Sequence, residues 1–423
     1  MAGTPRWLAP LLTRKMLICV FTGFSSGLPL FLLLQMLPIW LKEGGLDTAT
    51  IGKFALAQMP FAWKFLWAPL LDRYALPLGR RRGWMASSQI ALFLVIGVMG
   101  AFDPVAHLRL IFALSVVIAF LSATQDIALD AYRREILNDD AELGLGTAVH
   151  VNAYRIAGLV PGSLSLILAE MLPWGTVFWV TAFFMLPGLA MALLVREPPA
   201  IGAPRTLGAA VVEPFREFIG RKGWKAAALL LLFLLLYKLG DSLATALASV
   251  FYLEMGFSKQ DIGLVAKHAM LWPALLGGMI GGLWMVRLGI NRALWVFGVV
   301  QLVTILGFAW FAWVGPFDPD AITAANLWLL AAVIAAEYLG VGLGTAAFIA
   351  FIARNTHPAY TAAQFALFTC MTAVPRTVVN AFAGVWVEYL GWTRFFLICT
   401  LIAVPGMLLL FWVAPWNGEK EGA

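Results

Sequence analysis

Ionisable residues placed inside long apolar segments are the residues of this chain most capable of chemistry. A charged side chain at the centre of a bilayer costs about 2.5 to 3.5 kcal/mol even on insertion scales, so it faces a partner or a polar cavity rather than lipid. We therefore expect this set to bind a charged solute or to exchange protons. Its members are Lys64, Asp126, Asp130, Arg155, Lys238, Asp241, Lys267, Glu337 and Arg376.

Two of the acids are four residues apart in the segment TQDIALDAYRRE. On a helix this spacing places Asp126 and Asp130 on one face, with Gln125 alongside. Burial and a like-charged neighbour favour a carboxyl group that exchanges protons near neutral pH. In a second interpretation, Asp130 forms a structural ion pair with Arg133 or Arg134 near the helix end.

The cations of the set suggest what kind of solute the site accepts. The five cations outnumber the four acids, which indicates a locally positive cavity suited to carboxylates. The cations are Lys64, Arg155, Lys238, Lys267 and Arg376. The alternative is simple pairing of Lys238 with Asp241, three residues away on the same helix face. The two interpretations are compatible if a substrate displaces the pair. Asp241 and Glu337 are further candidates for proton coupling.

The segment FTGFSSGLP adds small and hydroxyl-bearing residues to the first apolar segment. Ser26 offers a hydroxyl group to a polar solute, and Gly27 permits bending or close helix contact. Close packing alone would explain the glycine. His268 beside Lys267 is a possible proton relay, with helix packing as the alternative.

The elements that must position these residues are apolar helices. Apolar residues make up 61% of the chain and charged residues 12%, about half the charged share of a soluble domain. Runs of about 20 apolar residues, each long enough to cross a bilayer, recur along the chain. The sequence predicts an all-α integral membrane protein with twelve spans, at 16–41, 50–71, 84–102, 108–131, 147–170, 175–195, 225–253, 260–286, 292–314, 325–352, 361–389 and 392–414.

The longest polar stretch divides these spans into two sets of six. We expect an N-terminal half over 1–195, a cytoplasmic linker over 196–224 that contains several prolines, and a C-terminal half over 225–423. Most of the 29 Lys and Arg residues fall on one side of this arrangement. Basic loops stay in the cytoplasm, so both termini are predicted to be cytoplasmic. Topology thus explains the net charge of +6 without a nucleic-acid partner.

An internal repeat supports two halves of the same orientation. Residues 43–52 (EGGLDTATIG) and 254–263 (EMGFSKQDIG) share Glu, Gly, Ile and Gly in order, each copy after the first span of its half. A weaker repeat links Trp174 with Trp392. Parallel six-helix halves are typical of transporters that work by rocking.

The loop between the second and third spans, APLLDRYALPLGRRRGW, resembles the cytoplasmic signature loop of the major facilitator superfamily. Its counterpart in the second half, GGLWMVRLGINR, is degenerate. The resemblance implies the major facilitator fold, with spans one, four, seven and ten lining the cavity. It also implies a salt-bridge latch that holds one conformation, formed here by Asp72, Arg73, Arg80 and Arg81; the alternative is that the arginines merely fix topology.

A narrower resemblance covers most of the N-terminal half. The strings FSSGLPLFLL, WKFLWAPLLDRY, GRRRGW and ATQDIALDAYRREIL are similar to those of the AmpG-type muropeptide permeases of Gram-negative inner membranes. The resemblance implies proton-driven import of N-acetylglucosaminyl-1,6-anhydro-N-acetylmuramyl peptides for peptidoglycan recycling, and thereby a part in β-lactamase induction. Alternatives on the same scaffold are a transporter of another large anion, such as acyl-coenzyme A, and a multidrug/proton antiporter.

The remaining features do not favour other classes. Three cysteines and four histidines lack paired or clustered spacing, and no nucleophile lies near a base at workable spacing. We expect a non-enzyme without metal or cofactor, whose partners are a small glycopeptide, protons and the lipid bilayer. The family's usual state is monomeric.

Overall fold

The computed structural model describes residues 11–46, 50–51, 54–199, 207–258, 261–381 and 383–418. Within these ranges the regular structure is helical, apart from one isolated bridge between Leu76 and Gly79. The predicted all-α architecture is confirmed. By internal contacts the chain forms two compact units, each described separately below.

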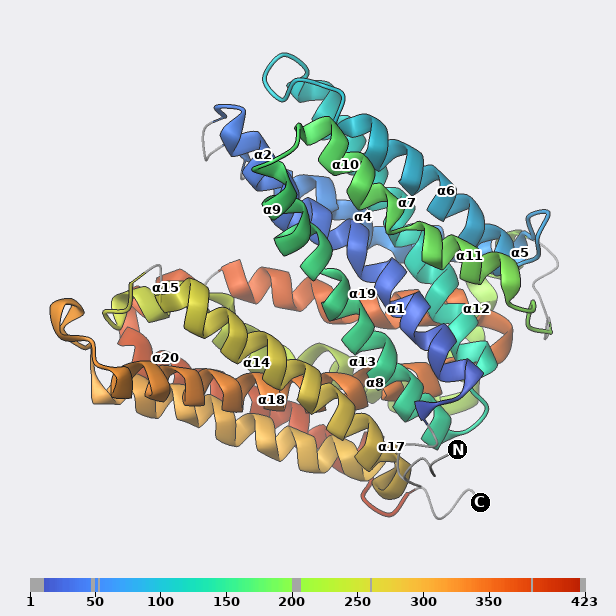
Figure 1. Cartoon of the computed structure of the whole chain (residues 1–423). Helices are drawn as coiled ribbons and strands as arrows, with labels where there is room; N and C mark the ends of the chain where they lie inside the picture. Colours follow the sequence, from blue (N-terminus) through green and yellow to red (C-terminus); the bar gives the residue numbers. More distant parts are fainter. Residues whose placement is uncertain are drawn as a thin grey trace, which may run out of the picture. The chain divides into compact units, whose positions relative to one another are not determined.

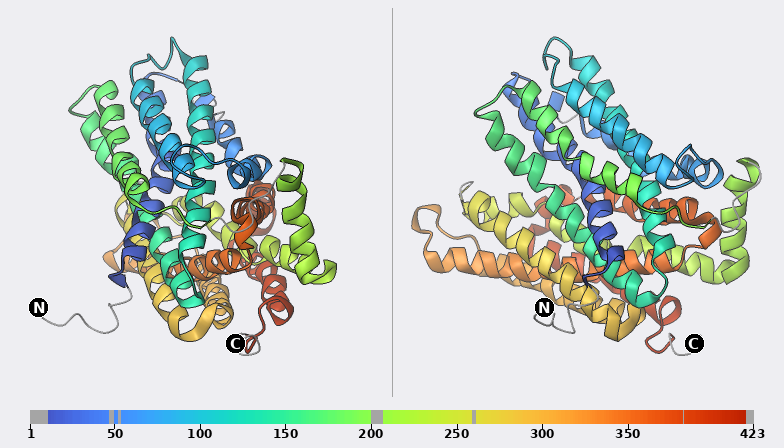
Figure 2. Two further views of the ribbon diagram at one scale, coloured as in Figure 1. Left: turned by 90° about the vertical axis from the view of Figure 1, so that its right-hand side faces the viewer. Right: turned by 45° about the vertical axis from the view of Figure 1, so that its right-hand side comes forward.

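Unit 1 comprises 1–138, 149–217 and 353–370. In this unit α6 packs against both α7 and α10, and α1 packs against α7 and α11. Figures 1 and 2 show these helices running alongside one another. A buried apolar cluster between these helices includes Leu28, Leu92 and Ile118. The elements up to the linker are α1 (Arg14–Phe31), η2 (Leu32–Met36), α2 (Leu37–Glu43), η3 (Phe54–Gln58), α4 (Met59–Trp63), η4 (Lys64–Leu66), α5 (Ala68–Arg73), α6 (Arg82–Met99), α7 (Leu108–Ile136), α8 (Asp140–Ala157), η5 (Val160–Leu164), α9 (Ser165–Ala169), α10 (Trp174–Phe183) and α11 (Leu186–Leu194).

Unit 2 comprises 139–148, 218–352 and 371–423. Here α20 packs against α13, α14 and α17 around an aromatic core that includes Phe251, Phe308 and Phe396. The linker and the following elements are α12 (Leu207–Lys222), α13 (Trp224–Leu236), α14 (Leu239–Ala246), α15 (Ala248–Glu254), η6 (Ile262–Ala266), α17 (Lys267–Val314), η7 (Pro319–Ala321), α18 (Ala324–Arg354), η8 (Pro358–Tyr360), α19 (Thr361–Ala381) and α20 (Ala383–Val413).

Two glycines divide the long helices α17 and α20. Gly289 and Gly391 both have φ of 74° inside otherwise helical segments. A side chain is strained at such a φ, whereas glycine is not. Each long element is therefore two helical pieces joined at a kink, at the positions where the sequence predicts the turns between its spans.

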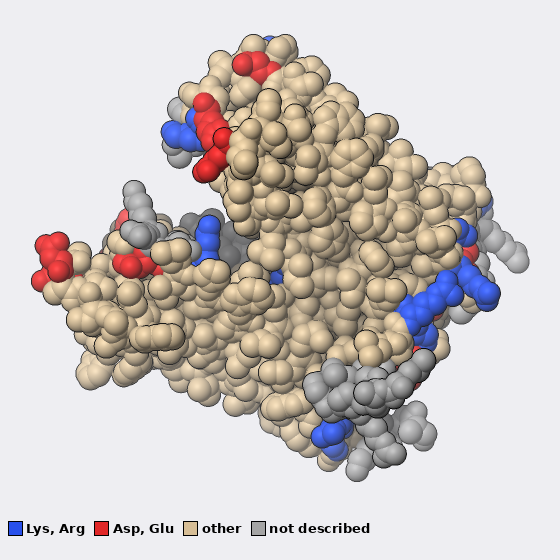
Figure 3. Space-filling model, in the orientation of Figure 1, with Lys and Arg blue, Asp and Glu red and all other residues tan. Residues whose placement is uncertain are grey.

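Nine helices among the described residues are long and apolar enough to cross a membrane. The predicted second span, 50–71, is instead broken into short pieces, because Pro60 and Pro69 each begin a new helical segment. The surface matches a membrane protein: on the face shown in Figure 3, charged side chains gather near helix ends and leave the helix flanks almost uncharged.

Candidate functional site

A carboxylate, an ammonium group and a hydroxyl group meet in the interior of unit 1. The Ser26 hydroxyl of α1 donates a hydrogen bond of 2.7 Å to Asp126 of α7. The Lys64 ammonium group of η4 lies 3.8 Å from the other oxygen of the same carboxylate. Both charged side chains are at most 13% exposed. The second expected span is broken next to Lys64, which is the first residue of a short 3-10 helix. This break brings the Lys64 side chain to Asp126.

One helical turn further along α7, Asp130 belongs to a second polar group. Arg133 donates to it at 3.0 Å, and His150 Nε2 lies 3.9 Å from the same oxygen. The other ring nitrogen of His150 is 3.0 Å from the Thr22 hydroxyl of α1. The structural ion pair with Arg133 is thus present, and a line of polar side chains joins Asp130 to α1.

Two candidates, Gln125 of α7 and Gly27 of α1, lie where α1 packs against α7 and α8. Gln125 is fully buried and donates 2.6 Å to the backbone carbonyl of Ser25. A Cβ atom at Gly27 would lie 2.4 Å from the carbonyl oxygen of Tyr154 in α8, which requires glycine for this close approach. Both positions therefore have a packing role whatever else they do.

In unit 2 the predicted pair of Lys238 and Asp241 is formed. Gln301 of α17 lies 3.4 Å from the bonded carboxylate oxygen of Asp241, and the second oxygen has no hydrogen-bond partner among the described residues. A small cavity lies beside this pair, with Tyr237, Gln301 and Met407 in its wall. Asp241 itself also lines this cavity.

The other candidates in unit 2 are separate from this pair or undescribed. Glu337 of α18 is 1% exposed. Neither carboxyl oxygen accepts a hydrogen bond from a described residue, although the Thr304 hydroxyl lies nearby. Lys267 is exposed at the start of α17, and His268 accepts a bond of 3.2 Å from Trp272. The side chain of Arg376, in α19, lies outside the described residues.

Arg155 of α8, in unit 1, is partly buried.

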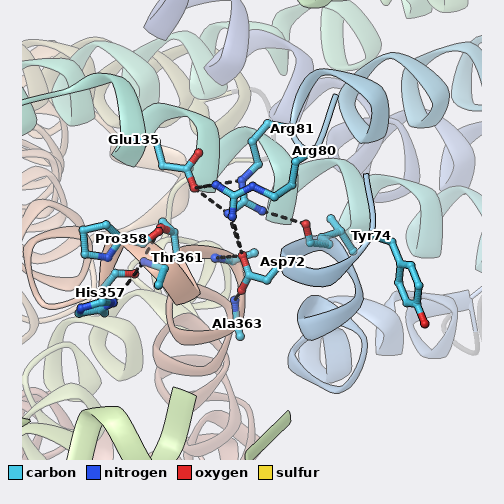
Figure 4. Close-up of polar contacts among 12 residues, drawn as sticks. Asp72, Tyr74, Arg80, Arg81, Glu135, His357, Pro358, Thr361 and Ala363 are labelled. Atoms are coloured by element: carbon cyan, nitrogen blue, oxygen red, sulfur yellow. Dashed lines mark hydrogen bonds and ion pairs between the residues drawn. The ribbon is translucent and has the colours of Figure 1, made fainter. Parts of the chain in front are cut away.

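The loop after α5 forms a buried ion network in unit 1 (Figure 4). Arg81 is fully buried and donates 2.7 Å to Asp72 and 2.6 Å to Glu135 of α7. Arg80 donates 3.1 Å to Glu135 and lies 3.9 Å from Asp72. Burial lowers the pKa of Arg81, but the two carboxylates outweigh it and hold that pKa above its ordinary value. We call these four residues the latch.

The latch also holds the beginning of α19. Asp72 accepts backbone N–H bonds of 3.3 Å from Ala362 and 2.9 Å from Ala363, in the first turn of that helix (Figure 4). Free N–H groups at a helix N-terminus carry a partial positive charge, so a carboxylate is favourable there. Arg73 is not part of the network; its guanidinium group lies over the ring of Tyr74.

Several residues of these groups have no signal in the sequence. Glu135 is 54 residues from Arg81, and His150 is 128 residues from Thr22. Gln301 looks like any polar residue of an apolar helix. Their roles come from tertiary contacts, which the spacing of residues along one helix does not predict.

Apolar helices with buried ionisable groups define a multi-pass membrane protein of the transporter class. The family model described as Major Facilitator Superfamily matches residues 19–322. The anhydromuropeptide permease of Escherichia coli is 40% identical over 93% of this chain and 78% of its own length. The chain therefore belongs to the major facilitator superfamily, in the branch of the AmpG-type permeases, and it is a transporter rather than an enzyme.

Two further proteins are similar to this chain. An uncharacterized protein of Haemophilus influenzae is 54% identical over 97% of this chain and 96% of its own length. The crystal structure of the human organic anion transporter MFSD10 (TETRAN) matches 96% of this chain with a TM-score of 0.63 at 17% identity, which supports the fold alone. The resemblance inferred from the sequence strings is confirmed.

Proposed function

We propose that this protein imports anhydro-muropeptides from the periplasm to the cytoplasm, driven by protons. The observation that carries the proposal is the 40% identity with the Escherichia coli anhydromuropeptide permease over nearly the whole chain. Imported products then serve peptidoglycan recycling and the signal for β-lactamase induction. A muropeptide brings several carboxylates, which the buried Lys64 and the partly buried Lys238 suit by charge.

Proton coupling is assigned to the Asp126 group. Asp126 is buried between Lys64 and the Ser26 hydroxyl, so a substrate carboxylate that approaches Lys64 competes with it for the cation. Protonation of Asp126 would release Lys64 to the substrate, which couples the two events. Asp241 paired with Lys238 offers the same exchange in unit 2, and Glu337 is a second proton acceptor there.

The same proposal includes the arrangement in the bilayer. We infer twelve spans in two parallel halves, with residues 196–224 as a cytoplasmic linker and both termini cytoplasmic, in the bacterial inner membrane. The positive-inside bias and the repeat at residues 43 and 254 support it. In this topology the latch lies on the cytoplasmic side, where it stabilises one conformation of the transport cycle, and a monomer suffices for transport.

Uptake of radiolabelled anhydro-muropeptide into proteoliposomes tests the function. We expect uptake by the wild type that depends on an inward-directed proton gradient, and uptake that is lost or no longer gradient-dependent in Asp126→Asn. Ser115→Ala is the control in the same helix, because Ser115 is buried in α7 and its hydroxyl donates to the carbonyl of Ile111 in that helix. A folded, inserted wild type without uptake would refute the muropeptide assignment. A mutant that keeps gradient-dependent uptake would refute the role of Asp126.

A further inference from the structure

The linker helix α12 has two different faces. On one side it is docked to the segment before and at the start of α19: Tyr360 donates 2.8 Å to Glu213, and Gln364 donates 2.9 Å to the carbonyl of Pro214 and 2.7 Å to Glu217. Burial and the bond to Glu213 raise the pKa of Tyr360 to about 12, which keeps this donor protonated at physiological pH.

The opposite face carries an exposed apolar stripe. Val212, Phe215 and Ile219 are 51%, 44% and 47% exposed. Their spacing of three and four residues places them on one side of the helix. Arg216, which is also exposed, borders the stripe next to Val212. An exposed stripe of this composition is not explained by docking to the protein, because Glu213 and Glu217 on the other side already make those contacts.

The position of α12 in the chain places the stripe at a membrane surface. Only Gly223 separates α12 from α13, an apolar helix long enough with α14 to cross a membrane, and the first residue of α13, Trp224, is 69% exposed. The helix itself does not qualify as a span, since it is 16 residues long and contains both acids and bases. Tryptophan at the end of a span and a basic amphipathic helix beside it are typical of the interface between hydrocarbon and headgroups.

We propose that α12 is an interfacial helix whose stripe, Val212, Phe215 and Ile219, lies in the cytoplasmic leaflet and whose bordering Arg216 binds anionic lipid headgroups. Arginine matches phosphate geometry, and the cytoplasmic leaflet is negatively charged. Glu217, on the docked face of α12, accepts a hydrogen bond from Gln364. The neighbouring residue, Ala363, donates its backbone N–H to Asp72 of the latch. Lipid contact on one face of α12 is therefore linked, through its other face, to the start of α19 that Asp72 contacts.

Nitroxide labels on the full-length protein in vesicles test the proposal. Single cysteines are introduced in a background in which the three buried native cysteines, Cys19, Cys370 and Cys399, are replaced. Val212→Cys, Phe215→Cys and Ile219→Cys label the stripe. Gly220→Cys is the matched control on the same helix, where an added Cβ meets nothing within 4 Å. In vesicles that contain phosphatidylglycerol, the stripe labels should be more accessible to oxygen than to a water-soluble nickel chelate, and the Gly220 label should show the reverse.

The lipid charge is tested by the same readout. In phosphatidylglycerol vesicles, Arg216→Gln should lower the ratio of lipid-exposed to water-exposed label at Phe215 about fivefold, and it should have no effect in vesicles of phosphatidylcholine alone. Stripe labels reached mainly by the nickel chelate would refute the membrane contact. Labels reached by neither reagent would mean that protein covers the stripe, and equal depth in both lipids would refute headgroup recognition. Each outcome is independent of uptake and therefore of the proposed substrate.

Discussion

Removal of the charge of Asp72 is the most direct test of the latch. Asp72→Asn keeps the size of the side chain but leaves Arg81 with only Glu135 as an anionic partner within the network. It also replaces the carboxylate that accepts the first N–H groups of α19. Because Asp72 and Arg81 are both fully buried, water cannot substitute for the lost partner.

The expected cost follows from this burial. Removing one member of a buried ion pair costs about 3 to 5 kcal/mol. Glu135 still neutralises Arg81 at 2.6 Å, so we expect the lower end of this range. About 3 kcal/mol corresponds to roughly a hundredfold change in the equilibrium between the held and the released state of α19.

A native thiol reports this release. Cys370 lies in α19, is 3% exposed and donates to the carbonyl of Phe61 in α4 at 3.6 Å. With Cys19 and Cys399 replaced, the rate of Cys370 alkylation by a maleimide at fixed pH should rise about a hundredfold in Asp72→Asn. Asp103→Asn, in an exposed loop, should leave the rate unchanged. An unchanged rate in a mutant with native circular dichroism would refute the argument that Asp72 holds α19.

Substitutions at two other places test the packing and the charge pairing. Gly27→Ala should lower the thermal stability of the purified protein by about 1 to 3 kcal/mol, because its methyl group would lie 2.4 Å from the Tyr154 carbonyl oxygen; stability equal to wild type would contradict the close approach of α1 and α8. Lys238→Met should lower stability by about 3 kcal/mol by leaving Asp241 buried without its cation, and the added change Asp241→Asn should restore most of it. If the restored double mutant transports as well as the wild type, substrate does not use this pair.

Much of the fold could be predicted because it depends on local composition. The length and position of the apolar helices follow from the apolar runs, and the ends of α7 and α18 lie within a few residues of the prediction or extend beyond it into the loop. The broken second span could not be predicted from hydropathy, which registers Pro60 and Pro69 as part of an apolar run. Their effect is conformational, through fixed φ and the missing N–H group.

Contacts between charged residues of the candidate site could be predicted where both residues lie on one helix, and not where they lie on different helices. The pairs of Lys238 with Asp241 and of Asp130 with Arg133 are three residues apart, so one turn of helix brings them together. The bond from Ser26 to Asp126 joins residues 100 positions apart. Such contacts require the packing of α1 against α7, and a single sequence contains no measure of that packing.

The repeat acquires a structural meaning in the two units. In unit 1 Trp174 donates to Glu43 at 2.8 Å, and in unit 2 Trp392 donates to Glu254 at 2.7 Å. Both pairs link the helix end after the first expected span of a half to the start of its last expected span, so each unit contains this contact.

The loop after the second expected span did not keep its partners in the same way. In unit 1 Asp72 accepts from Ala363, 291 residues away. The second copy has no acid at the equivalent place, and there Arg292 donates to the carbonyl of Trp416, 124 residues away near the C-terminal end of α20. The first copy therefore contacts the N-terminus of α19, whereas the second contacts the segment that follows α20. Because the second copy has no carboxylate at the equivalent place, neutralising Asp72 alone should be enough to release the start of α19.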